Sequence, residues 1–161
     1  MAIEITDASN AKEILRTFGC REPQALAVLP VNLDTARSSD ELLLGGEAEI
    51  IEQLLRAADL EPEDVFEGRR LPFRLRKHLD WDGGMLFVGL LANAASIVSA
   101  FEAIRAHLQQ QFPRGGRSPK VRLEVLFETT ETDSSKCIRF EGRAEQLSEI
   151  PRIIRETRDV R

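Results

Sequence analysis

One long apolar segment limits what this chain can fold into. The segment Met85–Phe112 opens with Met85–Phe101, which holds no charged residue, and then continues as an amphipathic pattern. At about 1.5 Å per residue, a helix over the whole segment would be about 40 Å long. The segment predicts such a helix, and one narrow stripe along it predicts core residues: Ile97, Phe101, Ile104 and Leu108.

The uncharged run Met85–Phe101 has three readings. At about 17 residues it lies at the lower limit of the roughly 17–25 residues that span a bilayer. It also contains Asn93, Ser96 and Ser99, and the charges that flank it show no positive-inside bias. We therefore expect a central helix covered by protein, while insertion into a membrane or burial in a partner stays open as the alternative.

The segments around this helix predict a small sheet and several shorter helices. Alternation predicts an antiparallel hairpin from Lys120–Thr129 and Lys136–Glu141. Further strands are expected at Ala2–Thr6 and Ala25–Leu33, a turn at Asp82–Gly84, and helices at Ala11–Phe18, Glu47–Ala58, Leu71–Leu79 and Ala144–Thr157, the last kinked or restarted at Pro151. The pattern indicates an α+β fold, with a small antiparallel sheet packed on the long central apolar helix and flanking helices.

Length and composition indicate a single domain over residues 1–161. The chain has 161 residues, of which 42% are hydrophobic and 30% charged, as in soluble globular domains. The loop Arg114–Pro119 is the best candidate for a subdivision, and we do not expect it to separate independent domains.

The residues that usually carry catalysis or metal binding are scarce. Two cysteines and two histidines are too few for a typical four-ligand zinc site, and Cys20 and Cys137 belong to no CxxC pair, so we expect reduced thiols. The phosphate-binding, GxSxG and HExxH motifs are absent, so no catalytic, cofactor-binding or metal residue is assigned. The start, MAIEITD, predicts no secretory signal peptide and hence a cytoplasmic protein.

Two charged blocks lie close together in the sequence. The basic block comprises Arg69, Arg70, Arg74, Arg76 and Lys77. The acidic block Asp40–Asp64 holds nine acidic residues against Arg56 alone. A net charge of −5 and few aromatic residues argue against nucleic-acid binding. We predict that the basic block contacts protein, and that the two blocks face each other within the chain or between copies.

The second half of the chain resembles a known group of proteins. A Gly-Gly pair opens the apolar segment GGMLFVGLLANAASIVSAFEAIRAHL, which is followed by KVRLEVLF and KCIRFEGRAEQLSEIPRIIRE. Over Asp82–Glu156 this pattern is similar to the small effector-associated accessory components of bacterial conflict (defence) systems. The resemblance implies a non-catalytic adaptor or regulator whose partner is an effector or a second copy, and it carries over no catalytic residues.

The expected function is therefore a non-enzymatic protein-interaction module of a bacterial multi-component effector system. Two alternatives stay open. One is a small enzyme that uses His78 or His107 with nearby carboxylates. The other is a membrane-associated protein that inserts Met85–Phe101.

Overall fold

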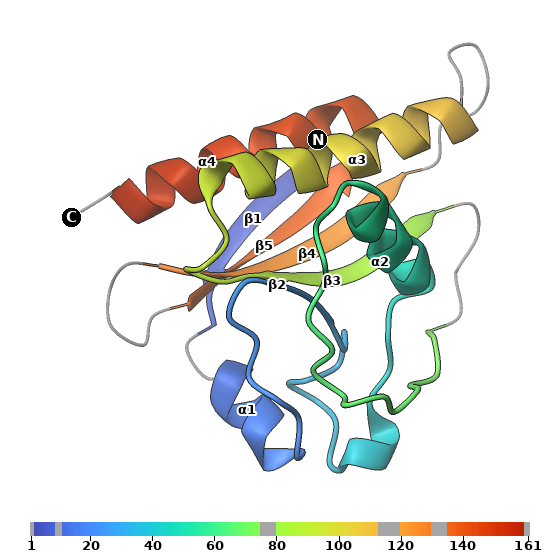
Figure 1. Ribbon diagram of the computed structural model, residues 1–161, viewed down its shortest axis with the longest axis vertical. Helices are drawn as coiled ribbons and strands as arrows, with labels where there is room; N and C mark the ends of the chain where they lie inside the picture. The colour runs from blue at the N-terminus through green and yellow to red at the C-terminus, as the bar shows by residue number, and fades with distance from the viewer. Residues whose placement is uncertain (1, 9–10, 75–79, 113–119, 130–134, 160–161) are drawn as a thin grey trace.

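A five-stranded sheet forms the centre of the molecule (Figure 1). The computed structural model describes residues 2–8, 11–74, 80–112, 120–129 and 135–159. The strands lie in the order β1-β5-β4-β3-β2. Their bounds are β1 Ala2–Asp7, β2 Leu26–Leu29, β3 Trp81–Val88, β4 Val121–Glu128 and β5 Ser135–Gly142.

The strand pairing is antiparallel except at the centre of the sheet. β4 and β5 form the predicted hairpin, while β1 and β2 add antiparallel strands at the two edges. β3 and β4 are parallel, and the chain between them crosses over through helix α3, Ala94–Gln111. A parallel pair needs such a crossover because its two strands start at the same end of the sheet. The predicted α+β fold, with a long helix packed on a mostly antiparallel sheet, is confirmed.

The helices cover the two faces of the sheet unequally. Helices α2 (Ala48–Ala57), α3 and α4 (Glu149–Asp159) cover one face, here called the helix face (Figure 1). The short helix α1, Ala11–Thr17, lies on the other face, here called the second face. Two 3₁₀ turns, η1 (Ser39–Glu41) and η2 (Ala144–Ser148), complete the described elements.

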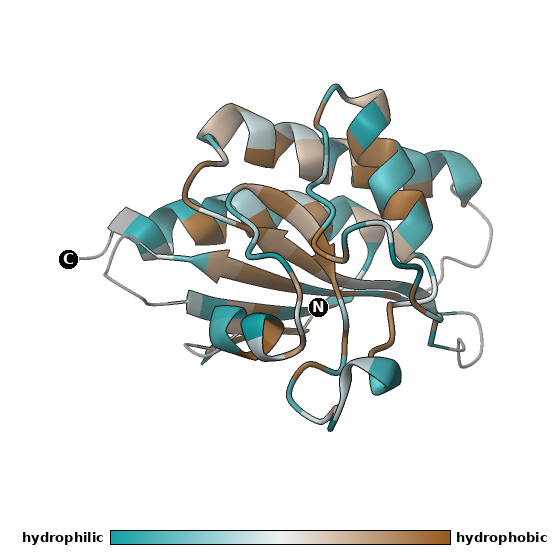
Figure 2. Ribbon diagram, turned by 60° about the horizontal axis from the view of Figure 1, so that its bottom comes forward, coloured by the Kyte–Doolittle hydropathy of each residue, from teal (hydrophilic) through white to brown (hydrophobic). Residues whose placement is uncertain are grey.

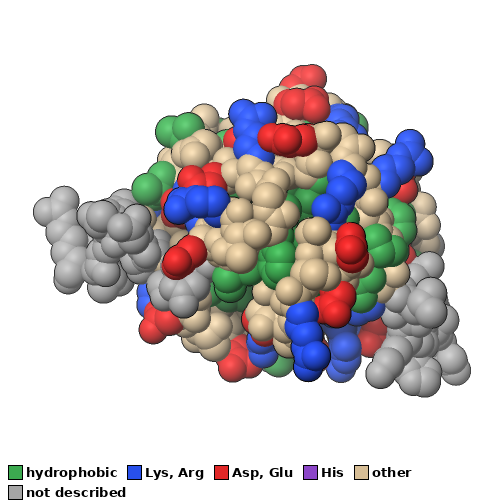
Figure 3. Space-filling view, turned by 90° about the horizontal axis from the view of Figure 1, so that it is seen from below, with side chains coloured by type: hydrophobic (Ala, Val, Ile, Leu, Met, Phe, Trp, Pro, Cys, Tyr) green, Lys and Arg blue, Asp and Glu red, His purple; other side chains and the backbone are tan. Residues whose placement is uncertain are grey.

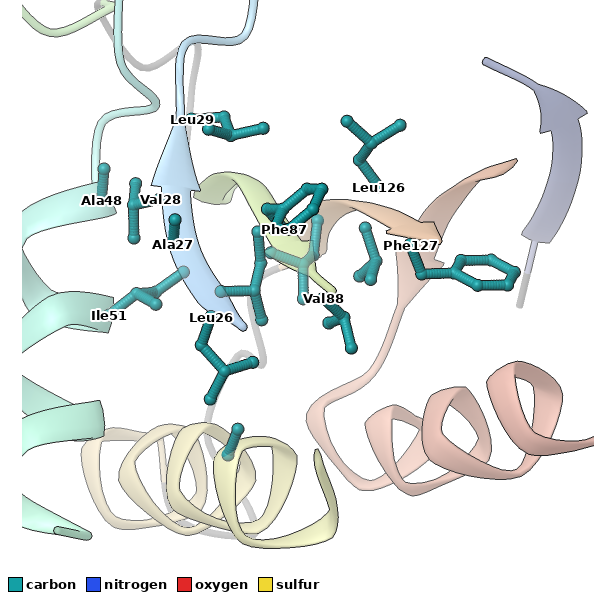
Figure 4. Close-up of a cluster of buried hydrophobic side chains, with 14 of the residues drawn as sticks. Leu26, Ala27, Val28, Leu29, Ala48, Ile51, Phe87, Val88, Leu126 and Phe127 are labelled. Carbon is teal, nitrogen blue, oxygen red and sulfur yellow. The ribbon is translucent and has the colours of Figure 1, made fainter. Parts of the chain in front are cut away.

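The core lies between the sheet and the long helix. All four residues of the predicted stripe on α3 are buried: Ile97, Phe101, Ile104 and Leu108. Figure 4 shows Leu26 and Val88 pointing towards α3, while Leu29 and Leu126 point to the opposite side of the sheet. Hydrophobic residues gather along the strands and on the inner sides of the helices (Figure 2). The central strands are therefore buried on both faces.

The prediction of one helix over Met85–Phe112 is wrong in its first part. Met85–Val88 belongs to strand β3, and the helix begins at Ala94. The side chain of Asn93 caps this helix by accepting a hydrogen bond from Ser96 N at 2.8 Å. A strand covered on both faces is apolar throughout rather than alternating, so its sequence has no period that separates it from a buried helix.

The predicted turn at Asp82–Gly84 is also wrong, because these residues lie inside β3. The pairing of β3 with β4 shifts between Asp82 and Met85, which indicates a bulge. Gly84 has φ of +75°, and a Cβ at Gly45 would lie 2.3 Å from Gly84 Cα. The glycines therefore allow two backbone segments to touch where the strand is distorted.

Two further predictions differ from the structure in detail, and a third agrees with it. The first part of the predicted helix Leu71–Leu79 is extended, with a bridge between Phe73 and Leu44, and residues 75–79 lie outside the described part. β2 ends at Leu29 because Pro30 lacks a donor for the ladder. The predicted restart near Pro151 is confirmed: η2 precedes α4, in which Pro151 is the third residue, where a backbone N–H has no helical partner.

Candidate interaction surface

The basic block is partly used by the fold. Arg74 donates two hydrogen bonds to Asp82, from Nε to Oδ2 at 3.0 Å and from Nη2 to Oδ1 at 2.9 Å. Arg69 donates from Nη2 to the carbonyl oxygen of Ser39 at 2.6 Å. Arg70 is exposed and has no hydrogen bond or ion pair with another described residue. The rest of the block, Arg76 and Lys77, lies outside the described residues, as does His78.

Asp82, in the bulge of β3, binds the side chain of Arg74 and the backbone of Gly46 and Gly84. Asp82 is only 6% exposed, and it also accepts hydrogen bonds from Gly46 N and Gly84 N at 3.2 and 3.1 Å. Burial favours the neutral acid, but the bonds from Arg74 and the two amides outweigh it, so the pKa of Asp82 lies below its usual range. Arg74 therefore has a structural role.

The acidic and basic blocks line the same cavity. This charged cavity has a volume of about 300 Å³ and is lined by seven charged residues: Arg56, Arg69, Arg70, Glu49, Glu52, Glu63 and Asp64. Glu63 accepts bonds from Gln24 N and Ala25 N, and Asp64 accepts from Phe66 N and Gly68 N. The blocks thus face each other within the chain. The predicted contact of the basic block with another protein stays a prediction.

A second hollow lies on the second face, between α1, the chain after β2 and the sheet. This second-face groove has a volume of about 330 Å³, and its polar lining includes Asp34, Glu124, Cys137 and Arg139. Figure 3 shows this side of the molecule, with hydrophobic side chains among Lys, Arg, Asp and Glu. Burial raises the pKa of Glu124, although the positive charge of Arg139 opposes that shift.

The thiol in the second-face groove is mostly protonated at neutral pH. Burial, with a smaller contribution from the charge of Glu124, raises the pKa of Cys137 to about 11. Cys137 and Cys20 are both free thiols. His107 is on α3, which covers the helix face, so it does not join this groove. Within the described residues, no three His, Cys, Asp or Glu side chains are arranged to hold a metal ion.

A third hollow lies between the start of α3 and helix α4. This α3–α4 groove has a volume of about 380 Å³. Its walls are mostly apolar: Ala94, Ile97, Val98, Pro151 and Ile154. Its polar lining is Ser148 and three arginines, Arg152, Arg155 and Arg158. No acidic residue lines it within the described part of the chain, in contrast to the charged cavity.

The three arginines share one side of α4 because their spacing of three residues approximates one helical turn. Arg152 forms an ion pair with Glu149 of the same helix. Arg155 is exposed, and it has no hydrogen bond or ion pair to another residue that the structure describes. The charge of Arg155 is therefore not balanced by another described residue.

Arg158 holds α4 against the ends of two strands. Its Nε donates to Glu128 O at 2.8 Å, and its Nη2 donates to Gly89 O at 3.1 Å. Burial lowers the pKa of this guanidinium, while the Glu128 carboxylate opposes the shift. The contacts fix one end of the α3–α4 groove beside the chain that joins β3 to α3.

That connection, residues 89–93, is here called the leucine turn, and it exposes large apolar side chains. Leu90 is 49% exposed and Leu91 is 72% exposed, while Val98, one turn into α3, is 48% exposed. They are three of the six large hydrophobic residues that are exposed in the described chain. Half of the exposed large hydrophobic residues described therefore lie in the leucine turn or in the first turns of α3, and one of them, Val98, lines the α3–α4 groove.

The backbone of the leucine turn is held in place. Gly89 N donates to Ala25 O at 2.6 Å, and Leu91 N donates to Gln24 O at 3.2 Å. Leu90 N donates to the carboxylate of Glu128 at 3.2 Å. A Cβ at Gly89 would lie 2.0 Å from Gln24 O, so only glycine permits this approach. The two leucines are thus presented to solvent on a fixed support.

Sequence reasoning missed this surface. Leu90 and Leu91 were hidden inside the predicted helix, although a Leu-Leu pair just before the capping Asn93 was a usable signal. Arginine at every third position from Arg152 to Arg158 was another. Neither signal indicates that the two segments meet, because they are far apart in the sequence.

Comparisons with known proteins find no relative of this chain. No protein-family model matches the chain, and neither a curated protein nor a solved structure matches it. Of the helices that the structure describes, none has the length and apolar character that crossing a bilayer requires.

Proposed function

We propose that the protein is a non-enzymatic interaction module that binds an acidic, amphipathic helix of a partner protein in the α3–α4 groove. The observation that carries this proposal is the exposure of Leu90, Leu91 and Val98 beside a groove with apolar walls. Exposed apolar side chains on a fixed backbone need little reordering on binding, which favours affinity.

The dimensions of the groove suit a short helix. Its α4 wall extends from Ser148 to Arg158, about 15 Å at the rise of a helix, which is about three turns. A helix in a groove binds through apolar side chains on one face, spaced three and four residues apart. Such side chains would pack on Ala94, Val98 and Pro151, which keep exposed surface in the groove.

The charge of the groove selects the chemistry of the partner. Arg152, Arg155 and Arg158 line one side, and no described acid lines the groove. Glutamate or aspartate on the outer side of the bound helix would pair with Arg155, which has no described partner. Charges at the rim of an interface affect the rate of association and the choice of partner more than its final affinity.

The resemblance to accessory components of bacterial conflict systems supports an effector protein as this partner. In that role the chain is a cytoplasmic adaptor whose partner carries the catalytic activity. The enzyme alternative, a site of His78 or His107 with nearby carboxylates, lacks comparable support, because His78 lies outside the described residues and His107 lines none of the three hollows described above. Membrane insertion of Met85–Phe101 would require β3 to leave the centre of the sheet.

A binding experiment with defined probes tests the proposal. The probe is a fluorescent helical peptide with leucine at every third or fourth position and glutamate between them. We expect binding to the full chain, and a loss of about 30-fold in the Leu91→Asp variant, as for a central apolar anchor. The Phe73→Asp variant is the matched control, since Phe73 is also exposed but lies by the charged cavity.

The same variants separate the alternatives. Equal binding by the wild type and Leu91→Asp, or equal loss in Leu91→Asp and Phe73→Asp, contradicts the groove as the site. Vesicles of anionic phospholipid form the second arm. Vesicle binding that Leu91→Asp abolishes, without peptide binding, would replace the protein partner by a membrane surface.

A further inference from the structure

One edge strand of the sheet has its outer backbone groups covered, and the other does not. The outer edge of β2 is covered, because Glu63 pairs with Ala27 and donates from its N–H to Leu26 O at 2.8 Å. The carboxylate of Glu63 also accepts the N–H groups of Gln24 and Ala25. β1 pairs with β5 on one side, and no described strand pairs with its other side. An open edge is a template for another strand.

The register identifies the backbone groups that β1 leaves open. Ala8 N donates to Ser135 O at 2.9 Å, which continues the β1–β5 pairing by one residue. In an antiparallel pair, bonded and non-bonded residue pairs alternate. Thr6, Glu4 and Ala2 therefore bond to β5 as Ala8 does. The N–H and C=O groups of Ile3, Ile5 and Asp7 point away from the sheet.

The side chains of β1 suit a pairing partner that is itself apolar at the centre. Ile5 is 45% exposed and lies opposite Ile138 of β5. The two acids of the strand each lie opposite a basic residue: Glu4 pairs with Arg139, and Asp7 lies 2.9 Å from Nζ of Lys136. The neighbouring strand thus offsets the negative charge of the edge.

We propose that β1 pairs antiparallel with β1 of a second copy of this chain, with Ile5 opposite Ile5 of that copy. This register also places Ile3 opposite Asp7 of the second copy, so the outward backbone groups of both strands meet. Each bonded pair exchanges two hydrogen bonds, which gives about six across the interface. The two five-stranded sheets become one continuous sheet.

Charge favours this register over the alternative register that is centred on Glu4. Centring the pair on Glu4 would place Glu4 opposite Glu4 of the second copy, and like charges that face each other across strands destabilise the pair. Centring on Ile5 places Glu4 opposite Thr6 instead. It also buries the exposed side chain of Ile5 against its own counterpart.

The dimer lies on a different surface from the α3–α4 groove, so it is independent of the proposed function. Pairing through one strand buries little area, and we expect a reversible dimer with a dissociation constant of about 10–100 µM. Sedimentation of the wild-type chain across that range measures it. A chain that stays monomeric throughout overturns the proposal.

Cysteine cross-linking tests the register. In the proposed dimer the two Ile5 Cα atoms lie about 5.5 Å apart, within the range that a disulfide bridges. We expect the Ile5→Cys variant to form a covalent dimer on mild oxidation. The Ile3→Cys variant is the control, since its two Cα atoms would lie about 14 Å apart. A mixture of Ile3→Cys and Asp7→Cys chains should cross-link again. The wild type controls for Cys20 and Cys137.

Proline substitution tests the backbone pairing. Ile5→Pro removes a donor that points away from the sheet, whereas Thr6→Pro removes one that bonds to β5. We expect Ile5→Pro to be monomeric with near-wild-type resistance to unfolding, and Thr6→Pro to unfold more easily. Ile5→Lys, which sets two lysines face to face, gives the same answer if Ile5→Pro misfolds. Unchanged dimerisation in Ile5→Lys, or cross-linking as strong at residue 3 as at residue 5, overturns the proposal.

Discussion

The charged cavity and the α3–α4 groove are similar in size and each is lined by three arginines, yet the fold uses them differently. In the charged cavity Arg56, Arg69 and Arg70 face four acidic residues. In the α3–α4 groove, Arg152, Arg155 and Arg158 face apolar side chains, and the described lining holds no acid. The difference indicates that the charged cavity balances its own charge, whereas in the α3–α4 groove Arg155 is left without a described partner.

This comparison shows why a dense basic block in a sequence is a weak sign of a binding site. Arg74 and Arg69 both have partners in the chain, one a buried carboxylate and the other a carbonyl oxygen. The arginines of α4 are more widely spaced in the sequence. One of them, Arg158, donates to the carbonyl oxygen of Gly89, two residues before Leu91, which is 72% exposed. The neighbours of a charged residue therefore matter more than the local density of charge.

The largest effect is expected on stability, from a substitution in helix α3, which forms one wall of the α3–α4 groove. Phe101 is fully buried on the inner side of α3, whereas Val98, one turn earlier, faces the groove. We expect Phe101→Ala to lower the free energy of unfolding by about 3–5 kcal/mol, the usual cost of removing a buried aromatic side chain. Val98→Ala should cost less than about 1 kcal/mol. Denaturant unfolding of both variants measures the difference.

The two variants should also differ in binding. Val98→Ala should weaken binding of the acidic helical peptide while leaving the fold intact. A loss of stability below about 1 kcal/mol in Phe101→Ala would contradict a rigid α3 wall.

The sequence was sufficient where an element has one buried side. The stripe on α3 and the β4–β5 hairpin both follow from periodicity, because in each element solvent-exposed positions recur between the apolar ones. Met85–Val88 has none, so strand and helix look alike there. The bulge at Gly83 and Gly84 depends on contact with Gly45, a residue from a distant segment. No local pattern reports such a contact.

The candidate interaction surface was less predictable than the fold. Helical spacing alone places Arg152, Arg155 and Arg158 on one side of a helix. Exposure of Leu90 and Leu91 depends on bonds from the leucine turn to Gln24 and Ala25, which are more than sixty residues away. Burial and exposure of leucine look the same in a sequence, so the surface emerges only when these segments meet.

The second prediction compares one arginine from each region. Arg74→Ala leaves Asp82 buried without its guanidinium, and we expect a loss of about 2–3 kcal/mol, less than for a fully buried pair because Arg74 is partly exposed. Arg155→Ala should change stability by less than about 0.5 kcal/mol. Thermal unfolding at neutral pH measures both. Equal losses would mean that Arg155 also serves the fold, and the contrast between the two regions would disappear.

The third prediction uses pH to isolate the Asp82 contribution. Because the folded-state pKa of Asp82 is lowered, its ionised form stabilises the fold above the unfolded pKa of about 3.9. That stabilisation is lost as the pH falls through the folded-state value. The wild type should therefore lose stability more steeply below about pH 4 than Asp82→Asn, which lacks the titrating group. Urea unfolding from acid to neutral pH tests this, and parallel curves would contradict it.

The last and smallest effect concerns the thiol in the second-face groove. Its reactivity tests whether this groove is the site of an enzyme. Cys137 is 7% exposed and has a pKa of about 11, so at pH 8 about one thiol in a thousand is ionised. Burial also raises the pKa of Cys20, but that side chain is only half-buried. With a chromogenic disulfide reagent we expect Cys20 to react first and Cys137 to react slowly, and both to react quickly after unfolding in urea. The Cys20→Ser variant isolates the slow thiol. If native Cys137 instead reacted as fast as an unfolded thiol, the second-face groove would hold an activated nucleophile. That result would support an enzyme, through a cysteine site distinct from the His78 or His107 site that the sequence suggested.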